Sequence, residues 1–163
     1  MVLVVAIILS TLAQRPSDVV RWTAVGPATS IKAGETTTIK ITADIEPGWQ
    51  LYALTQLEGG PRPLEIKSPR QSPFSVVASR IKAPLPKVAK TSGDPPVVDP
   101  QFYDETTTFD VPVAIPVTTQ AGKASVPIEI TFQACDGRLC LRPATETVSA
   151  DVIVSSRAGK DRE

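Results

Sequence analysis

Histidine and asparagine are both absent from the 163-residue chain. Without histidine, the chain cannot form Ser-His or Cys-His nucleophilic pairs, nor histidine-ligated zinc, copper or haem sites. Only two cysteines are present, so a tetrahedral zinc site of cysteine and histidine ligands cannot be completed. Without asparagine there is no acceptor for N-linked glycosylation. We therefore expect no metal and no cofactor.

Net charge is lacking as well, because 17 lysines and arginines balance 17 aspartates and glutamates. This balance excludes the basic footprint of a nucleic-acid-binding protein and gives no reason to expect an anionic membrane surface as partner. The carboxylates are scattered, and no pair is spaced for acid–base work, so the sequence does not support a hydrolase. The length suits a single domain.

The N-terminal segment carries the one long apolar run. Residues 2–13 read VLVVAIILSTLA, which has the length of a signal-peptide core and is too short for a membrane span of about 20 residues. Thr11 and Ala13 suit the small-residue positions before a cleavage site, although no lysine or arginine precedes the run. We predict that residues 1–13 are a signal peptide and that the protein is periplasmic or otherwise exported; the alternative is a buried strand. In an oxidising compartment two cysteines usually form a disulfide.

Short runs of alternating apolar and polar residues fill the rest of the chain, with no long helical periodicity. The predicted strands are 36–45, 49–54, 64–67, 75–81, 107–117, 124–134 and 145–154. Pro112 and Pro116 argue that 107–117 is an edge strand or contains bulges. About six to eight strands at this spacing predict an all-β domain, an immunoglobulin-like antiparallel β-sandwich over 19–154.

Two segments read as non-strand. Residues 82–101 contain five prolines, which predicts a long, extended surface loop of the kind that is often functional. Residues 155–163 form a charged tail, predicted to be disordered.

The two cysteines occupy the segment TFQACDGRLCLRP at 131–143. If Asp136-Gly137 turns a hairpin, Cys135 and Cys140 oppose each other with Cα atoms about 4.5–5.5 Å apart, within disulfide range. A loop this short contributes only about 2 kcal/mol to stability, so the bond is a weak staple. Arg138 and Arg142 either stabilise a thiolate or are simply solvated. A structural disulfide, an exchangeable disulfide and free thiols all remain open at this point.

Three segments together resemble a known family. They are Gly48-Trp49-Gln50-Leu51-Tyr52, the pair Phe102-Tyr103 before the strand at 109–117, and the hairpin Phe132-Gln133-Ala134-Cys135 with Cys140-Leu141-Arg142-Pro143. With Val20-Arg21-Trp22 they cover most of 19–154, and they resemble the periplasmic N-terminal domain of the thiol:disulfide interchange protein DsbD, a domain also found in stand-alone form.

The resemblance implies a monomeric immunoglobulin-like domain that carries reducing equivalents, as a component of a protein-disulfide reductase system. It implies thioredoxin-like partners: a membrane transporter module as electron donor, and exported disulfide isomerases or cytochrome c maturation proteins as acceptors. By the same resemblance, Cys140 attacks and enters the mixed disulfide, and Cys135 resolves it.

The family pattern also assigns surroundings to the pair. Phe102 and Tyr103 are expected to cap the disulfide, or alternatively to be core anchors at the start of a strand, and Tyr52 is expected close to the sulfurs. This sequence lacks the adjacent acidic residues that some members place before the aromatic cap, so any tuning of the cysteine pKa by such acids is either absent or falls to Asp99 alone. Arg142 also stands where the family often has proline.

Two further functions stay open from the residues alone. The chain can be a non-catalytic exported binding module with a structural hairpin disulfide, in which case Cys-to-Ser changes leave function intact. It can also be a structural subunit of an envelope assembly, in which case the mature domain self-associates.

Overall fold

The computed structural model describes residues 15–90 and 98–156. The predicted signal peptide, residues 91–97 of the predicted loop and residues 157–163 of the predicted tail lie outside this part. Over the described residues the chain is all-β, with only two 3-10 turns, η1 (Pro16–Asp18) and η2 (Ala78–Arg80). No helix in the described part has the length and apolarity needed to cross a membrane.

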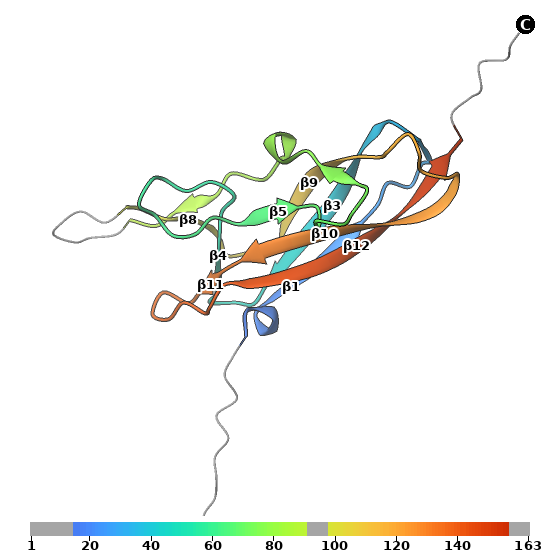
Figure 1. Ribbon diagram of the computed structural model, residues 1–163. Coiled ribbons are helices and arrows are strands. Elements are labelled where there is room, and N and C mark those ends of the chain that lie inside the picture. The colour runs from blue at the N-terminus through green and yellow to red at the C-terminus, as the bar shows by residue number, and fades with distance from the viewer. Residues whose placement is uncertain (1–14, 91–97, 157–163) are drawn as a thin grey trace, which may run out of the picture.

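The strands form three sheets (Figure 1). The first contains, in spatial order, β1 (Val20–Val25), β3 (Thr36–Ile45), β9 (Thr107–Ala114) and β6 (Ser75–Val76). The second contains β2 (Ile31–Lys32), β12 (Ala144–Ser155), β10 (Gly122–Phe132) and β5 (Glu65–Lys67). The third contains β11 (Ala134–Cys135), β4 (Gln50–Tyr52), β8 (Gln101–Tyr103) and β7 (Lys87–Val88). Every pairing is antiparallel except the short one between β12 and β2.

The first two sheets form the sandwich, and the third lies at one end of it (Figure 1). Buried and exposed residues alternate along the strands, so each sheet has one face that packs against the other sheet. Along β3, for example, Ile39, Ile41 and Ala43 are completely buried between exposed or half-buried neighbours. One buried face per sheet is what two packed layers require. The predicted immunoglobulin-like sandwich is therefore confirmed.

A chain of aromatic rings crosses all three sheets. Trp22 of β1 packs edge-on against Phe132 of β10, with ring centroids 5.3 Å apart, and also meets Phe109 of β9 at 6.2 Å. Tyr103 of β8 meets Phe109 edge-on at 5.5 Å. Edge-on pairs of this kind contribute about 0.5–1.5 kcal/mol beyond the area they bury, so these contacts fix the small third sheet against the sandwich.

Of the two alternatives predicted for 107–117, the edge strand is wrong, because β9 lies between β3 and β6. The proline is accommodated on the side away from β3. There, Asp110 exchanges backbone hydrogen bonds with Lys82, and the Pro112 carbonyl accepts from the Val77 amide. Between Val77 and Lys82 the chain leaves the sheet as η2, so no strand requires the N–H that proline lacks.

The predicted loop at 82–101 is also interrupted. Lys87 and Val88 form β7, which pairs with Phe102 and Gln101 of β8. The strand predicted at 75–81 is shorter than expected, since β6 ends at Val76 before η2.

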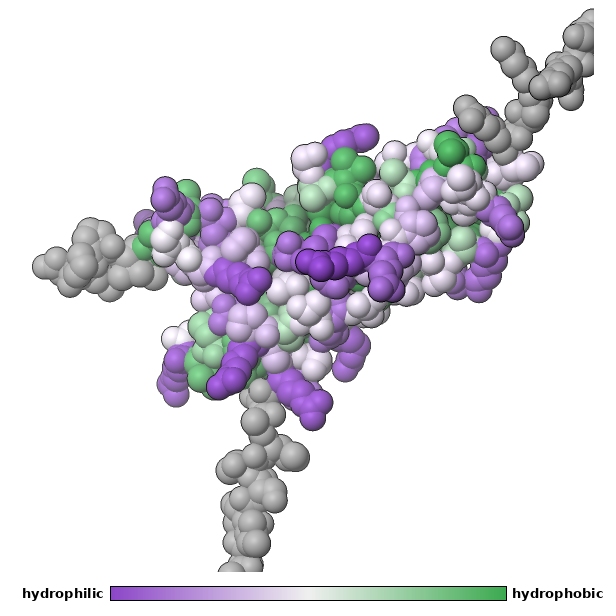
Figure 2. All heavy atoms as spheres, viewed as in Figure 1, coloured by the Kyte–Doolittle hydropathy of each residue, from purple (hydrophilic) through white to green (hydrophobic). Residues whose placement is uncertain are grey.

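Charged side chains lie across the middle of the outer face over β5 and β10 (Figure 2). Lys67 of β5 forms ion pairs there with Glu65 at 3.1 Å and with Glu129 of β10 at 3.4 Å. These pairs are solvated, so they define the exposed face of this sheet more than they stabilise it.

Burial in the sandwich predicts the effect of two isoleucine truncations. Ile128 of β10 is fully buried, whereas Ile153 on the neighbouring β12 is 49% exposed. We expect Ile128→Ala to lower the free energy of unfolding by about 2–5 kcal/mol, and Ile153→Ala by about 1 kcal/mol or less. Urea denaturation measures both, and equal losses would contradict the assigned faces of the second sheet.

Candidate functional site

The two cysteines are joined in a disulfide at the end of the third sheet. Cys135 is the last residue of β11 and pairs with Cys140 as an isolated antiparallel bridge, with Cα atoms 4.1 Å apart. Cys135 is only 4% exposed, whereas Cys140 lies at the surface. A reagent that approaches the folded domain therefore meets Cys140 before Cys135.

The loop between the cysteines is organised by the side chain of Asp136. Its Oδ1 accepts hydrogen bonds from the amides of Arg138 at 2.8 Å and Leu139 at 2.7 Å. Gly137 has φ 86°, in the left-handed region that favours glycine. The amide of Leu139, followed by that of Arg138, holds the pKa of the Asp136 carboxyl below its ordinary value, since these hydrogen bonds favour the charged form.

Tyr52 of β4 is the side chain that contacts the disulfide. Its hydroxyl oxygen lies 3.2 Å from Cys135 Sγ and 3.6 Å from Cys140 Sγ. Because the sulfurs of a disulfide carry no proton, the phenol must be the donor. Burial raises the pKa of Tyr52 above its ordinary value, so the hydroxyl keeps its proton at neutral pH.

Strand register decides which predicted residues share a face with the disulfide. Cys135 pairs with Gln50, and Tyr52 pairs with Phe102. Since residues two apart on a strand point the same way, Cys135, Tyr52 and Phe102 lie on one face of the third sheet. Phe102 is 7% exposed, beside Tyr52 and two strands from Cys135.

Tyr103 lies on the opposite face. It pairs with Leu51, packs on Phe109 in the core, and donates its hydroxyl to the carbonyl of Pro84 at 3.2 Å. The structure therefore does not bring Tyr103 to the disulfide, and its position is that of a core anchor.

The two predicted charged residues lie in loops. Arg138 is exposed at the tip of the hairpin, and its backbone amide serves the Asp136 turn. Asp99 is half-buried, two residues before β8.

Gln133, which has no predicted role, braces the segment that returns from the cysteine loop. Its side-chain amide donates to the carbonyl of Leu141 at 3.0 Å, while the amide of Leu141 donates to Ala134 at 2.9 Å. Gln133 belongs to the hairpin motif that resembles the family. The spacing of that motif does not indicate which group the side chain of Gln133 binds.

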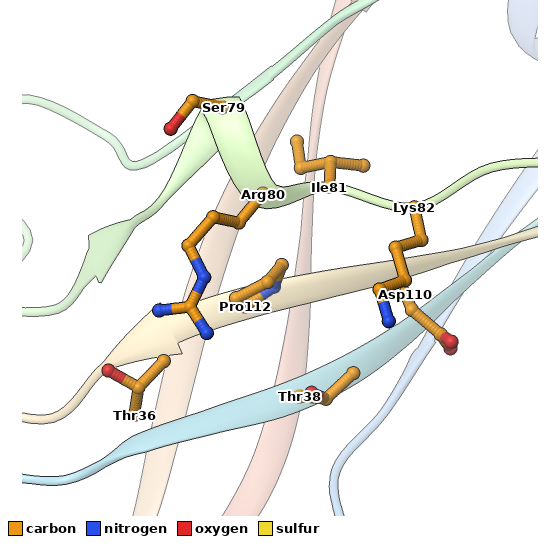
Figure 3. A pocket seen from close by; sticks show the side chains of 8 residues that line it. All are labelled: Thr36, Thr38, Ser79, Arg80, Ile81, Lys82, Asp110 and Pro112. Carbon is orange, nitrogen blue, oxygen red and sulfur yellow. The ribbon is translucent and has the colours of Figure 1, made fainter.

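A hollow of about 450 Å³ lies elsewhere, where η2 covers β3 and β9. Figure 3 shows Arg80 reaching from η2 across Pro112 toward Thr36, with Lys82 beside Asp110. None of the predicted site residues lines it, so the disulfide remains the candidate site.

The sequence matches the family described as "Thiol:disulfide interchange protein DsbD, N-terminal" over residues 20–152. The chain belongs to this family. Membership in this DsbD family agrees with a disulfide that has one exposed sulfur, and it supports a thiol–disulfide exchange domain.

One solved structure supports the fold. The N-terminal periplasmic domain of ScsB from Proteus mirabilis matches with a TM-score of 0.52 and 21% identity, over 85% of this chain and 48% of that one. The chain thus spans about half the length of that structure. A family 123 glycoside hydrolase from Clostridium perfringens aligns with a TM-score of only 0.31 and 11% identity, over 77% of this chain and 22% of that one, and this match carries no argument. No curated protein sequence matches the chain.

The hydrogen bonds to the Asp136 carboxylate predict that the cysteine loop changes with pH when this carboxyl is protonated. A carboxylate accepts the two amide hydrogen bonds better than a carboxylic acid does. Because the pKa is lowered on folding, the loop contacts are complete above the ordinary aspartate value of about 3.9 and are lost as pH falls through the lower folded value. We expect the Arg138 and Leu139 amide resonances to titrate with a midpoint below about 3.9.

Asp136→Asn should remove this titration, and Asp151→Asn, on β12, should leave it in place. A midpoint at or above the ordinary value in the unmodified protein would contradict the assigned hydrogen bonds.

Proposed function

We propose that this domain exchanges disulfides with thioredoxin-like proteins through Cys135 and Cys140. The observation that carries the proposal is the asymmetry of the bond: Cys140 is exposed, whereas Cys135 is 4% exposed and lies against the hydroxyl of Tyr52. A structural staple gains little from a loop that a hairpin already closes.

Reduction of the domain proceeds in two exchanges. A partner thiolate attacks Cys140 Sγ, the bond to Cys135 breaks, and its electron pair leaves on Cys135 as a thiolate. The hydroxyl of Tyr52, 3.2 Å away, stabilises that charge by a hydrogen bond. A second partner thiolate then attacks the partner's sulfur in the mixed disulfide, and Cys140 leaves with the electron pair. The domain ends as a dithiol and the partner as a disulfide.

Delivery of electrons is the reverse. The thiolate of Cys140 attacks a partner disulfide, and Cys135 resolves the mixed disulfide by attacking Cys140 Sγ. We propose that a thioredoxin-like module of a membrane transporter supplies the electrons, and that exported disulfide isomerases or cytochrome c maturation proteins receive them. Residues 1–13 would direct export, and 19–154 would form the working monomeric domain.

Phe102 is proposed as the cap, without Tyr103. It shares the face of Tyr52 and is buried outside the main core cluster. Its neighbour across the ladder, Lys87, is ion-paired to Asp104 at 2.8 Å, a solvent-exposed contact that a docking partner can replace at little cost. Arg138 and Asp99 are proposed to influence the thiolate electrostatically.

Cysteine substitutions test the assigned roles. Cys135→Ser leaves Cys140 free and exposed. This variant should form a stable mixed disulfide with a thioredoxin-like protein that keeps only its attacking cysteine, activated as the thionitrobenzoate mixed disulfide; Cys140 displaces thionitrobenzoate, and the product is visible on non-reducing gels. Cys140→Ser is the matched control and should trap little, because the remaining thiol is buried. Equal trapping by the two variants would contradict the assignment.

The reduction potential of the pair, measured in dithiothreitol buffers, should lie above about −300 mV, in the exchangeable range. A lower value without any exchange would overturn the proposal and favour a binding module with a structural disulfide.

A pair of tyrosine substitutions isolates the phenol. Tyr52→Phe removes the hydrogen bond to the leaving thiolate, so reduction by dithiothreitol should slow about fivefold to tenfold, equivalent to roughly 1–1.4 kcal/mol. Tyr103→Phe also loses one hydroxyl contact, but on the opposite face, and should lower stability by about 1 kcal/mol without changing the rate. Stopped-flow fluorescence measures the rates, and equal slowing in both variants would show that the phenol of Tyr52 has no specific role.

A further inference from the structure

A hollow of about 800 Å³ opens beside the exposed sulfur. It lies between the N-terminal turn and the start of β12, and its lining comes from the segments Arg15–Ser17, Leu139–Pro143 and Ala144–Glu146, which include Cys140. Small-molecule sites usually have volumes of about 300–1,000 Å³. A molecule bound here therefore lies next to the atom that takes part in exchange.

The hollow contains two positive groups and one negative group. Arg15 and Arg142 are exposed, and neither forms an ion pair within the described residues. Glu146 supplies the carboxyl, from the side of β12 that alternates inward. Leu139, at the rim, is 57% exposed.

The carboxyl of Glu146 lacks a partner on one oxygen. Its Oε1 is fully buried and accepts no hydrogen bond from the described residues. A buried acceptor left unpaired costs about 1–3 kcal/mol. Burial also raises the pKa of Glu146, which agrees with a carboxyl held away from water.

We infer that this hollow binds a small peptide thiol of the glutathione class, with its two carboxylates toward Arg15 and Arg142 and its ammonium toward Glu146. The charges of such a thiol complement the lining one for one. The inference rests on the proposed exchange function and adds a low-molecular-weight substrate to it.

The reaction balances with two molecules of thiol. The first thiolate attacks Cys140 Sγ to form a mixed disulfide, and Cys135 leaves as a thiolate. The second thiolate attacks the sulfur of the bound peptide, and Cys140 leaves with the electron pair. The protein gains two electrons and becomes a dithiol, and the two peptide thiols become one peptide disulfide.

Rates of reduction by glutathione and by 2-mercaptoethanol test the inference. After correction for thiol basicity, we expect glutathione to react about tenfold faster, as a few weak ion pairs would provide. Glu146→Gln and Arg142→Gln should each lower the ratio of the two rates about threefold. Arg70→Gln, an exposed arginine outside the hollow, is the matched control and should leave the ratio unchanged.

S-methylglutathione, which cannot react, tests binding alone. At millimolar concentration it should shift the amide resonances of Arg142, Thr145 and Glu146 in the oxidised protein.

Two results would overturn the inference. One is a corrected rate ratio near one, or an absence of shifts, in protein that dithiothreitol reduces normally; the exchange function would then stand without the peptide-thiol site. The other is that a thioredoxin-like protein shifts these amides and S-methylglutathione does not, which would make the hollow a protein-docking surface. A disulfide that resists dithiothreitol as well would instead contradict the proposed function itself.

Discussion

The pairing of β4 with β11 on one side and β8 on the other is the constraint on which the site depends. β4 has only three residues, yet their alternation sends Leu51 into the core and presents Tyr52 to the disulfide. The neighbouring strands follow the same alternation, so Cys135 and Phe102 lie on the face of Tyr52. A slip of one residue in this register would exchange the two faces, burying the phenol and exposing Leu51.

Packing against the sandwich fixes the position of the small third sheet. A sheet of strands two or three residues long has little stability of its own. The ring contact between Tyr103 and Phe109 ties it to the first sheet, and Trp22 continues the contact to the second. The hairpin closes through Gln133, Leu141 and the Asp136 turn. None of these contacts is made by a cysteine sulfur, so the hairpin is held by more than the disulfide.

Sequence patterns predict the positions of the long strands correctly. The alternation of Thr36 to Ile45 gave β3 with the bounds seen in the structure, and the runs that became β10 and β12 were placed within two residues at each end. Strands of two residues, such as β7 and β11, carry no periodic signal and form only because a neighbouring strand presents free backbone groups. Pro112 does not mark an edge strand, because a missing backbone donor matters only on a side where another strand pairs.

Some parts of the site can likewise be predicted from the sequence, and others cannot. The cysteines and Tyr52 were identified through a motif, and the structure places them in contact. Which of Phe102 and Tyr103 faces the disulfide depends on register, which the sequence does not state. Glu146 gave no signal at all, because a glutamate in an alternating strand reads as solvent-facing until the packing of β12 is known.

The unequal burial of the two cysteines limits how many partners can be bound covalently at one time. While the fold is intact, Cys140 alone is open to covalent attachment. Under the proposed exchange function, a donor and an acceptor occupy the same atom in turn, and no ternary complex joins both to the domain covalently. Electrons would then pass only by successive occupancy, and the partner that leaves more slowly would limit the rate at which the other reacts.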